Sequence, residues 1–316
     1  MPRIQVAQIE RAYTAIDPAF LHSPQLESGP LGAYCDAHII LKDETQNPIR
    51  SFKGRGADFF VHELPARPAR LVCASAGNFG QGLAYASVRR GIACDVFAAL
   101  TANPLKIERM RALGATVKLA GDDFDAAKDA ARAYASAAGV PFVEDGRDVS
   151  ISEGAGTLGI ELLSGPVRPD IIVIPLGNGA FLGGVATYVK HVSPSIRVIG
   201  VCAAGASAME QSWRRKTMIT TPDARTIADG IAVRVPIQEA LDDLRDVVDD
   251  IVLVSDDEIL SGMHFMFREH EQMLEPAGAV GVAALMARRK DFKGATVATV
   301  LCGANVTPEQ MRRWFA

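Results

Sequence analysis

The sequence has few cysteines and no pattern among them that would build a metal or disulfide site. Its 316 residues include five cysteines, an odd number, and these lie far apart without any C-x-x-C spacing: Cys35, Cys73, Cys94, Cys202 and Cys302. Neither a zinc knot nor a disulfide framework is therefore indicated, and a reducing cytoplasm is the compartment that fits best.

Concentrated charge and long apolar runs are also lacking. The 33 lysine and arginine residues nearly balance the 37 aspartate and glutamate residues, and no block of five like charges occurs. The net charge of −4 gives no general attraction to nucleic acid or to anionic lipid. No window reaches about 18 uninterrupted apolar residues, and the opening "MPRIQVAQIERAY" carries charges where a signal peptide is apolar. We therefore expect a small-molecule partner, no nucleic acid and no membrane.

What the sequence does contain is an alternation of apolar, strand-like runs with helical patterns. The runs stand in two series, at 71–77, 94–100 and 115–121 and at 170–175, 196–204, 250–255 and 296–303. Because they are continuously apolar, these runs predict parallel strands that are covered on both faces. The pattern therefore predicts an α/β protein of two lobes, each an open, mostly parallel sheet flanked by helices.

Three glycine-rich stretches follow such runs, at the positions where open parallel sheets bind ligands. They are "SAGNFGQG" (75–82), "PLGNGAFLGG" (175–184) and "LCGANV" (301–306). Any one of them could be only a tight turn. A dinucleotide site would need an acidic residue at the end of the strand after the second stretch, but that strand ends in Cys202, Ala203 and Ala204. What remains is a cup of N–H groups at a helix N-terminus, which favours a phosphate.

The stretch "SFKGRGADFF" (51–60) places Lys53 among small residues that let a ligand come close. A phosphate cup together with a lysine able to form a Schiff base suggests pyridoxal phosphate. With these motifs the chain resembles the fold-type II pyridoxal-phosphate enzymes, most closely the threonine/serine dehydratase and serine racemase group. Two further blocks, "TIADGIAV" (226–233) and "EPAGAVGVAAL" (275–285), stand in that family's order. The resemblance implies a large cofactor-binding domain at 1–70 and 148–316 and a small domain at 71–147.

The resemblance also implies a role for each motif. Lys53 would carry the cofactor through a Schiff base and then remove the substrate's α-proton, and Asn78 would hydrogen-bond the cofactor's ring hydroxyl. Cys302 would face the pyridine nitrogen. The substrate carboxylate would bind to residues 75–79, the asparagine loop: Ser75, Ala76, Gly77, Asn78 and Phe79. The cofactor's phosphate would bind to residues 177–181, the phosphate loop: Gly177, Asn178, Gly179, Ala180 and Phe181.

The neutral side chain of Cys302 bears on the reaction, because it cannot hold a proton on the pyridine nitrogen as an aspartate would. The ring is then a weaker electron sink, and a long-lived carbanion is disfavoured. A reaction in which a β-leaving group departs rapidly suits such a site. We expect β-elimination of L-threonine or L-serine to a 2-keto acid and ammonia, by a homodimer. Phe79 stands where the related dehydratases usually have a histidine, and the less polar pocket could accommodate a phenylserine. Arg50 could bind the second carboxylate of a hydroxyaspartate. Two further hypotheses stay open: a threonine synthase or β-replacement enzyme on the same fold, and a cofactor-free binding module.

Two departures from the family pattern carry further expectations. Cys202 and Ala208 stand where serine racemases have the glutamate and aspartate that hold a divalent cation, so no metal site is expected there. Ala76 stands where those enzymes have the serine that serves the second face of the planar intermediate. We therefore expect dehydration with little or no racemisation.

Overall fold

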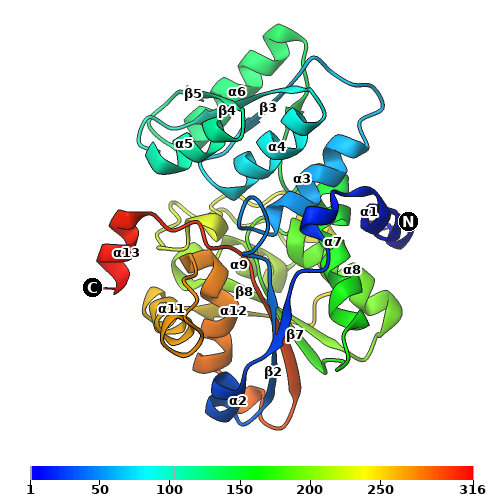
Figure 1. The fold of residues 1–316 in the computed structure, drawn as a ribbon, viewed down its shortest axis with the longest axis vertical. Helices are drawn as coiled ribbons and strands as arrows, with labels where there is room; N and C mark the ends of the chain where they lie inside the picture. The colour runs from blue at the N-terminus through cyan, green and yellow to red at the C-terminus, as the bar shows by residue number, and fades with distance from the viewer. Residues whose placement is uncertain (1, 103, 316) are drawn as a thin grey trace.

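The computed structural model describes residues 2–102 and 104–315, which form two lobes that Figure 1 shows one above the other. The larger, lower lobe contains a six-stranded sheet in the order β1-β2-β10-β7-β8-β9. Its strands are β1 (Gln25–Glu27), β2 (His38–Asp43), β7 (Ile171–Pro175), β8 (Arg197–Ala203), β9 (Asp250–Val254) and β10 (Thr296–Leu301). β1 is antiparallel to β2, and the other neighbouring pairs are parallel.

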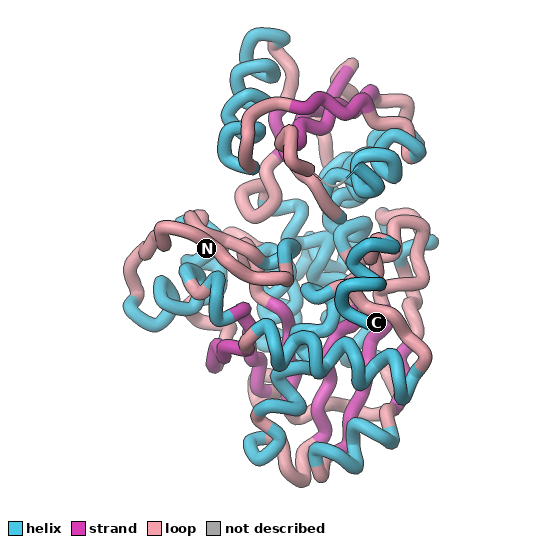
Figure 2. Tube along the Cα trace, turned by 90° about the vertical axis from the view of Figure 1, so that its left-hand side faces the viewer, coloured by secondary structure: helices cyan, strands magenta, loops and turns pink. Residues whose placement is uncertain are grey.

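The smaller, upper lobe contains a four-stranded parallel sheet in the order β5-β4-β3-β6. Its strands are β3 (Arg70–Ala74), β4 (Ala93–Ala98), β5 (Thr116–Leu119) and β6 (Phe142–Val143). The helices between them are α4 (Asn78–Arg89), α5 (Pro104–Ala112) and α6 (Phe124–Ala138). Figure 2 shows the strands of the two sheets as separate groups. One continuous segment of the chain therefore builds the whole second sheet, whereas the first sheet draws strands from both sides of that segment.

The remaining helices belong to the larger lobe or join the two lobes. They are α1 (Val6–Ala15), α2 (Gly29–Cys35), α3 (Lys53–His62), α7 (Val149–Ser164), α8 (Ala180–Val192), α9 (Ala208–Arg215), α10 (Gln238–Leu244), α11 (Asp256–His270), α12 (Pro276–Ala287) and α13 (Pro308–Phe315). None of the helices in the described ranges has the length and apolar content that a bilayer crossing requires.

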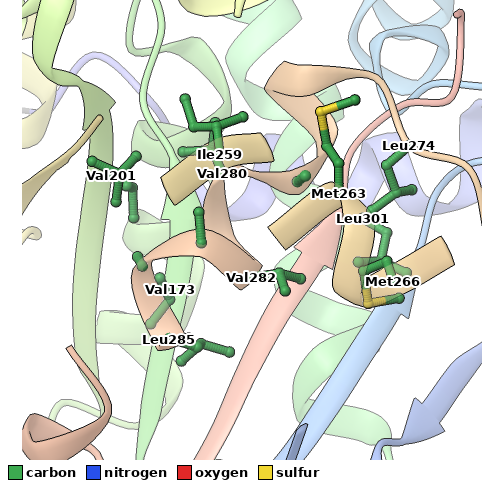
Figure 3. Packing of buried hydrophobic residues seen from close by; sticks show 14 of the residues in the cluster. Val173, Val201, Ile259, Met263, Met266, Leu274, Val280, Val282, Leu285 and Leu301 are labelled. Carbon is green, nitrogen blue, oxygen red and sulfur yellow. The ribbon is translucent and has the colours of Figure 1, made fainter. Parts of the chain in front are cut away.

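Helices cover both faces of the six-stranded sheet. On one face Val173, Val201 and Leu301 pack with residues of α11 and α12, as Figure 3 shows. On the other face Ile172 and Ile174 pack with residues of α7 and α8. Since neighbouring residues of one strand enter different cores, the strands read as continuous apolar runs. This burial confirms the α/β prediction.

The predicted runs match seven strands to within a few residues, but β1, β2 and β6 were not predicted. β1 has three residues and β6 has two, which are too few to show a run of apolar residues in the sequence. β2 ends in Lys42 and Asp43, which are only 3% and 1% exposed. Lys42 is buried because its Nζ lies 2.7 Å from a carboxylate oxygen of Glu161. Charged residues at the end of a run ordinarily indicate a solvated segment, so this strand could not be recognised from its residues.

Candidate active site

A cavity of about 720 Å³ lies between the two lobes. The chain reaches its wall where β3 and β6 of the small lobe end and where β7 and β10 of the large lobe end. The carboxyl ends of parallel strands are the usual ligand-binding edge of an α/β sheet. The cavity therefore lies at the edge where each of the two sheets would bind a ligand. Lys53, the asparagine loop and Cys302 line it, as do Gly177, Asn178, Gly179 and Phe181 of the phosphate loop.

Lys53 enters this cavity as the first residue of α3. Its neighbour Phe52 stacks on Phe181 of the phosphate loop, with ring centroids 4.1 Å apart, and donates its backbone N–H to the carbonyl of Cys302 at 3.2 Å. These contacts fix the start of α3 against two of the predicted motifs. The Nζ atom of Lys53 lies 2.5 Å from Oδ2 of Asp145 and 4.9 Å from the centroid of the Phe52 ring.

The phosphate loop joins β7 to α8. Gly179 has φ of +103°, a backbone conformation that an L-residue adopts only with strain, and it directly precedes the first residue of α8. Among the described residues, the N–H groups of Gly177, Asn178 and Phe181 form no hydrogen bond, whereas that of Ala180 donates to Oδ1 of Asn178 at 3.3 Å. Unpaired N–H groups at a helix N-terminus form a ready site for an anion.

The asparagine loop forms a second cluster of N–H groups, at the start of α4 in the opposite lobe. Oγ of Ser75 accepts hydrogen bonds from the N–H groups of Gly77 at 3.2 Å and Gly80 at 3.0 Å, so this side chain holds the loop in place. The N–H groups of Asn78 and Phe79 form no hydrogen bond with other described residues. Ala76, which stands between Ser75 and Gly77, also lines the cavity. The cavity therefore lies between two helix N-termini, each suited to an anion.

The side chain of Asn78 belongs to a buried polar group. Its Nδ2 donates to Oε1 of Glu275 at 2.5 Å, and its Oδ1 accepts from Nδ2 of Asn305 at 2.7 Å. Burial, followed by the nearby charge of Asp229, raises the pKa of Glu275. Arg109 donates to Oδ1 of Asn305 at 2.7 Å from the small lobe. These contacts fix the orientation of the Asn78 amide.

Cys302 follows β10 and is 4% exposed. Its Sγ lies 3.3 Å from the carbonyl oxygen of Val300, to which the thiol donates. Burial above all, and then the carboxylates of Glu44 and Glu275, raise the pKa of the Cys302 thiol well above its usual value. The side chain at this end of the sheet is therefore a neutral thiol at physiological pH.

Phe79 lies at the cavity wall, as the sequence suggested, whereas Arg50 does not. Phe79 touches the cavity, but it is 7% exposed and packs in the core of the small lobe with Leu83 and Val96. Its ring therefore leaves little free surface for a substrate. Arg50 has positive φ, is exposed and is not among the residues that line the cavity. The structure does not bring it to the site.

Several residues of the site were not singled out from the sequence. Glu275 and Asn305 stand inside quoted motifs, so the motifs could have indicated them. Lys106, on α5, is 7% exposed and pairs with Asp229, and both residues line the cavity. Asp145 lies in the loop after β6, and nothing in its sequence setting signals a contact with Lys53.

Lys53 between two anion cradles is the arrangement that pyridoxal phosphate requires, because the cofactor combines an aldehyde that reacts with a lysine and a phosphate. Unpaired N–H groups at the phosphate loop, an amine within the same cavity and a neutral thiol beyond it all fit this group. The fold and the site thus define a pyridoxal-phosphate dependent enzyme of the fold-type II architecture.

Comparison with known proteins supports the same cofactor and the same fold. Residues 16–303 match the family described as "Pyridoxal-phosphate dependent enzyme", and the chain belongs to this family. It is 33% identical to the chloroplastic biosynthetic threonine dehydratase of Arabidopsis thaliana over 92% of this chain and 50% of that one. It is 32% identical to the biosynthetic L-threonine dehydratase of Bacillus subtilis over 96% of this chain and 73% of that one. The chain thus spans half to three quarters of the length of these relatives.

The fold has a close match among solved structures. The processed form of threonine deaminase isoform 2 from Solanum lycopersicum superposes with a TM-score of 0.92 at 27% identity, over 99% of this chain and 94% of that one. The predicted family and the predicted cofactor, pyridoxal phosphate, are both confirmed.

Proposed function

We propose that this protein catalyses the β-elimination of a β-hydroxy L-amino acid, L-threonine or L-serine, to a 2-keto acid and ammonia. The observation that carries the proposal is the position of the Lys53 amino group in a cavity between two helix N-termini. One cradle suits the phosphate of the cofactor and the other suits the carboxylate of an amino acid. The threonine dehydratases to which the chain is similar support this assignment.

Pyridoxal phosphate, when bound, supplies a carbon that joins an amino group and a ring that draws electrons from the substrate's Cα–H bond. We assign the phosphate to residues 177–181, with the Ala180 N–H turned toward Asn178. Asn78 and Cys302 line the same cavity, and they would hold the cofactor ring through an amide and a neutral thiol. Lys53 removes the proton from Cα, because its Nζ is the amine that reaches into the cavity beside these groups.

The charges that line the cavity favour a substrate without a second carboxylate. Four cationic side chains line it, against seven acidic ones. The cations are Lys53, Lys106, Lys128 and Arg234, and the acids are Asp123, Asp125, Glu144, Asp145, Asp223, Asp229 and Glu275. Lys106, Lys128 and Arg234 are each already paired with an acid of this set. With Arg50 outside the cavity, a hydroxyaspartate would find no free cation among the described residues that line it.

A phenylserine-type substrate is the second candidate, favoured by the rim of the cavity rather than by Phe79. Phe124 and Val235 line the cavity and are 50% and 43% exposed. These two side chains offer apolar surface to a large β-substituent.

We further propose that residues 71–147 form a small domain, built around the four-stranded sheet, and that residues 1–70 and 148–316 form the large cofactor-binding domain. Three ion pairs join these residues to the rest of the chain beside the cavity: Arg234 with Asp125 at 2.6 Å, Lys106 with Asp229, and Lys53 with Asp145. We also propose a cytoplasmic homodimer. Light scattering on the purified protein tests the assembly.

The decisive experiment is a panel of amino acids assayed for keto-acid release. L-threonine, L-serine, 3-phenylserine and 3-hydroxyaspartate would each be supplied to the cofactor-loaded protein, with and without an added thiol, and Lys53→Ala would serve as the inactive control. We expect keto acid from threonine or serine at a rate that the thiol does not change. A thioether product would favour β-replacement instead, and a visible absorption band that is absent from the purified protein would favour a cofactor-free binding module.

A further inference from the structure

Asp145 holds a carboxylate against the amino group on which the proposed reaction depends. Its Oδ2 atom lies 2.5 Å from Nζ of Lys53, and the side chains of the two residues are only 12% and 15% exposed. Oδ1 of Asp145 is buried and forms no hydrogen bond with any described residue. Lys53 is the one cation found to pair with Asp145 among the described residues.

The loop that carries Asp145 is fixed independently of this contact. The N–H of Glu144 donates to Oδ2 of Asp148 at 2.8 Å, and Nη2 of Arg132 donates to both carboxylate oxygens of Glu144 at 2.8 Å. Gly146, with φ of +93°, lies so close to Asn178 of the phosphate loop that a Cβ there would come within 3.2 Å of it. The loop therefore aims the carboxylate of Asp145 at the cavity and does not depend on Lys53 to do so.

The chemistry of the proposed function gives this carboxylate a partner besides Lys53. With pyridoxal phosphate bound, the amino group of an amino-acid substrate would take the place of the Lys53 amino group, so Asp145 would meet the two groups in turn at nearly the same place. A carboxylate that contacts one of them lies within reach of the other. An acid with a free, buried oxygen beside that position is suited to accept a hydrogen bond from an ammonium group.

We propose that Asp145 is a substrate-binding residue that recognises the α-amino group of the incoming amino acid. This inference rests on the proposed function, because it takes the substrate to be an amino acid that replaces Lys53 on the cofactor. The asparagine loop binds the carboxylate of the substrate and Asp145 binds its amino group, so the two ends are held by different parts of the small lobe. Acids without an amino group lack the positive charge that Asp145 recognises and gain at most a neutral hydrogen bond from it.

The test compares two ligands that cannot undergo elimination, because neither has a β-leaving group. L-alanine carries the amino group, and L-lactate carries a hydroxyl in its place. The affinity of the cofactor-loaded protein for L-alanine is measured from the change in its visible spectrum, and that for L-lactate from competition with L-alanine. In Asp145→Asn we expect the affinity for L-alanine to fall by about tenfold to a hundredfold, the range for a charge-assisted hydrogen bond. The affinity for L-lactate should change much less, because its hydroxyl carries no charge.

Two controls separate this role from a structural one. Asp223→Asn removes another acid of the same cavity, one that pairs with Arg225 at 2.7 Å, and should leave both affinities unchanged. Asp145→Glu restores the charge and should bind L-alanine more tightly than Asp145→Asn does. Cofactor content is checked in every variant by borohydride reduction and mass spectrometry of the Lys53 peptide.

Several results would overturn the proposal. They are an unchanged affinity for L-alanine in Asp145→Asn, equal losses for L-alanine and L-lactate, and an effect of Asp223→Asn as large as that of Asp145→Asn. A variant that takes up no cofactor would also overturn it, because Asp145 would then serve the cofactor rather than the substrate. None of these results depends on elimination, so the proposed function and this inference can fail separately.

Discussion

Replacing Glu161 by glutamine is expected to destabilise the protein, because this carboxylate balances buried positive charge. The guanidinium of Arg55, which is 0% exposed, donates to both oxygens of Glu161 at 2.8 and 3.1 Å and to both oxygens of Glu44 at 2.8 and 2.9 Å. Lys42, which is also buried, lies 2.7 Å from Glu161. Two cations and two carboxylates thus cancel, and an amide at position 161 would leave one positive charge unbalanced.

Two arguments give the magnitude. Burial opposes the charged form of Glu161, but the hydrogen bonds and charges of Arg55 and Lys42 outweigh burial and lower the pKa of Glu161 from 4.5 to about 2. At about 1.36 kcal/mol per pKa unit, this difference corresponds to roughly 3 kcal/mol near neutral pH. Breaking a buried ion pair by removing one partner costs about 3–5 kcal/mol in other proteins. We therefore expect Glu161→Gln to lower the free energy of unfolding by about 3 kcal/mol at pH 7.

The sign of the pH dependence follows from the same shift. Because the pKa of Glu161 is lower in the folded protein than in the unfolded chain, its stabilisation is complete above about pH 4.5 and is lost as the pH falls toward 2. Urea unfolding of both proteins should thus give a smaller difference at pH 3 than at pH 7. A difference below about 1 kcal/mol at pH 7, or an equal difference at both pH values, would refute the reasoning.

Glu153 provides a matched control on the same helix, α7. It is 5% exposed and accepts one hydrogen bond, from the N–H of Gln5 at 3.1 Å, but no cation pairs with it among the described residues. Burial raises the pKa of Glu153, so its charge opposes folding at neutral pH. Glu153→Gln should therefore leave the free energy of unfolding unchanged or increase it. An equal loss in the two variants would mean that any buried carboxylate matters, paired or not.

Three further outcomes are expected from the site. Lys53→Ala should lose the absorption band of the lysine-bound cofactor and its turnover but still bind the cofactor in calorimetry, through residues 177–181; normal turnover would contradict the mechanism. EDTA should not reduce activity, since Cys202 and Ala208 offer no carboxylate, and a loss that magnesium reverses would be the contrary result. Ala76 cannot carry a proton, so chiral chromatography of the remaining substrate should show little or no D-amino acid, and substantial D-product would mean that another group protonates the second face.

The sequence predicted the parts of the site that local chain geometry determines. Lys53 and the two loops could be recognised because each stands where a strand or helix begins or ends, and because glycines mark close approach of the backbone. Ser75 illustrates how local this information is. Its hydroxyl accepts hydrogen bonds from Gly77 and Gly80, within five residues of itself, so its part in shaping the loop is contained in the motif.

Other residues depend on contacts between distant parts of the chain. Asp145 reaches Lys53 across 92 residues of sequence, and Glu275 reaches Asn78 across 197. Arg50 shows the converse, because its place beside the lysine motif suggested a role in the cavity. Its positive φ accompanies a side chain that is exposed rather than in the cavity, and no residue pattern around it signals this conformation. Packing between distant parts of the chain determines where such side chains lie. These contacts cannot be predicted from a single sequence.

Backbone geometry explains why the phosphate loop can carry Asn178 and Ala180 among its glycines. Of its five residues only Gly179 has φ in the left-handed region, so glycine is required there and not at positions 178 and 180. The side-chain Oδ1 of Asn178 accepts a hydrogen bond from the N–H of Ala180. This bond stabilises the first turn of α8, but it also leaves one N–H group fewer in the phosphate loop to bind an anion. Its neighbour across the cavity wall, Gly146, has φ of +93°, and a Cβ at this position would lie 3.2 Å from Asn178, so a larger residue would be strained and would require Asn178 to shift. An asparagine at 178 and a glycine at 146 are therefore coupled through space, and the same contact brings the Asp145 loop against the phosphate loop.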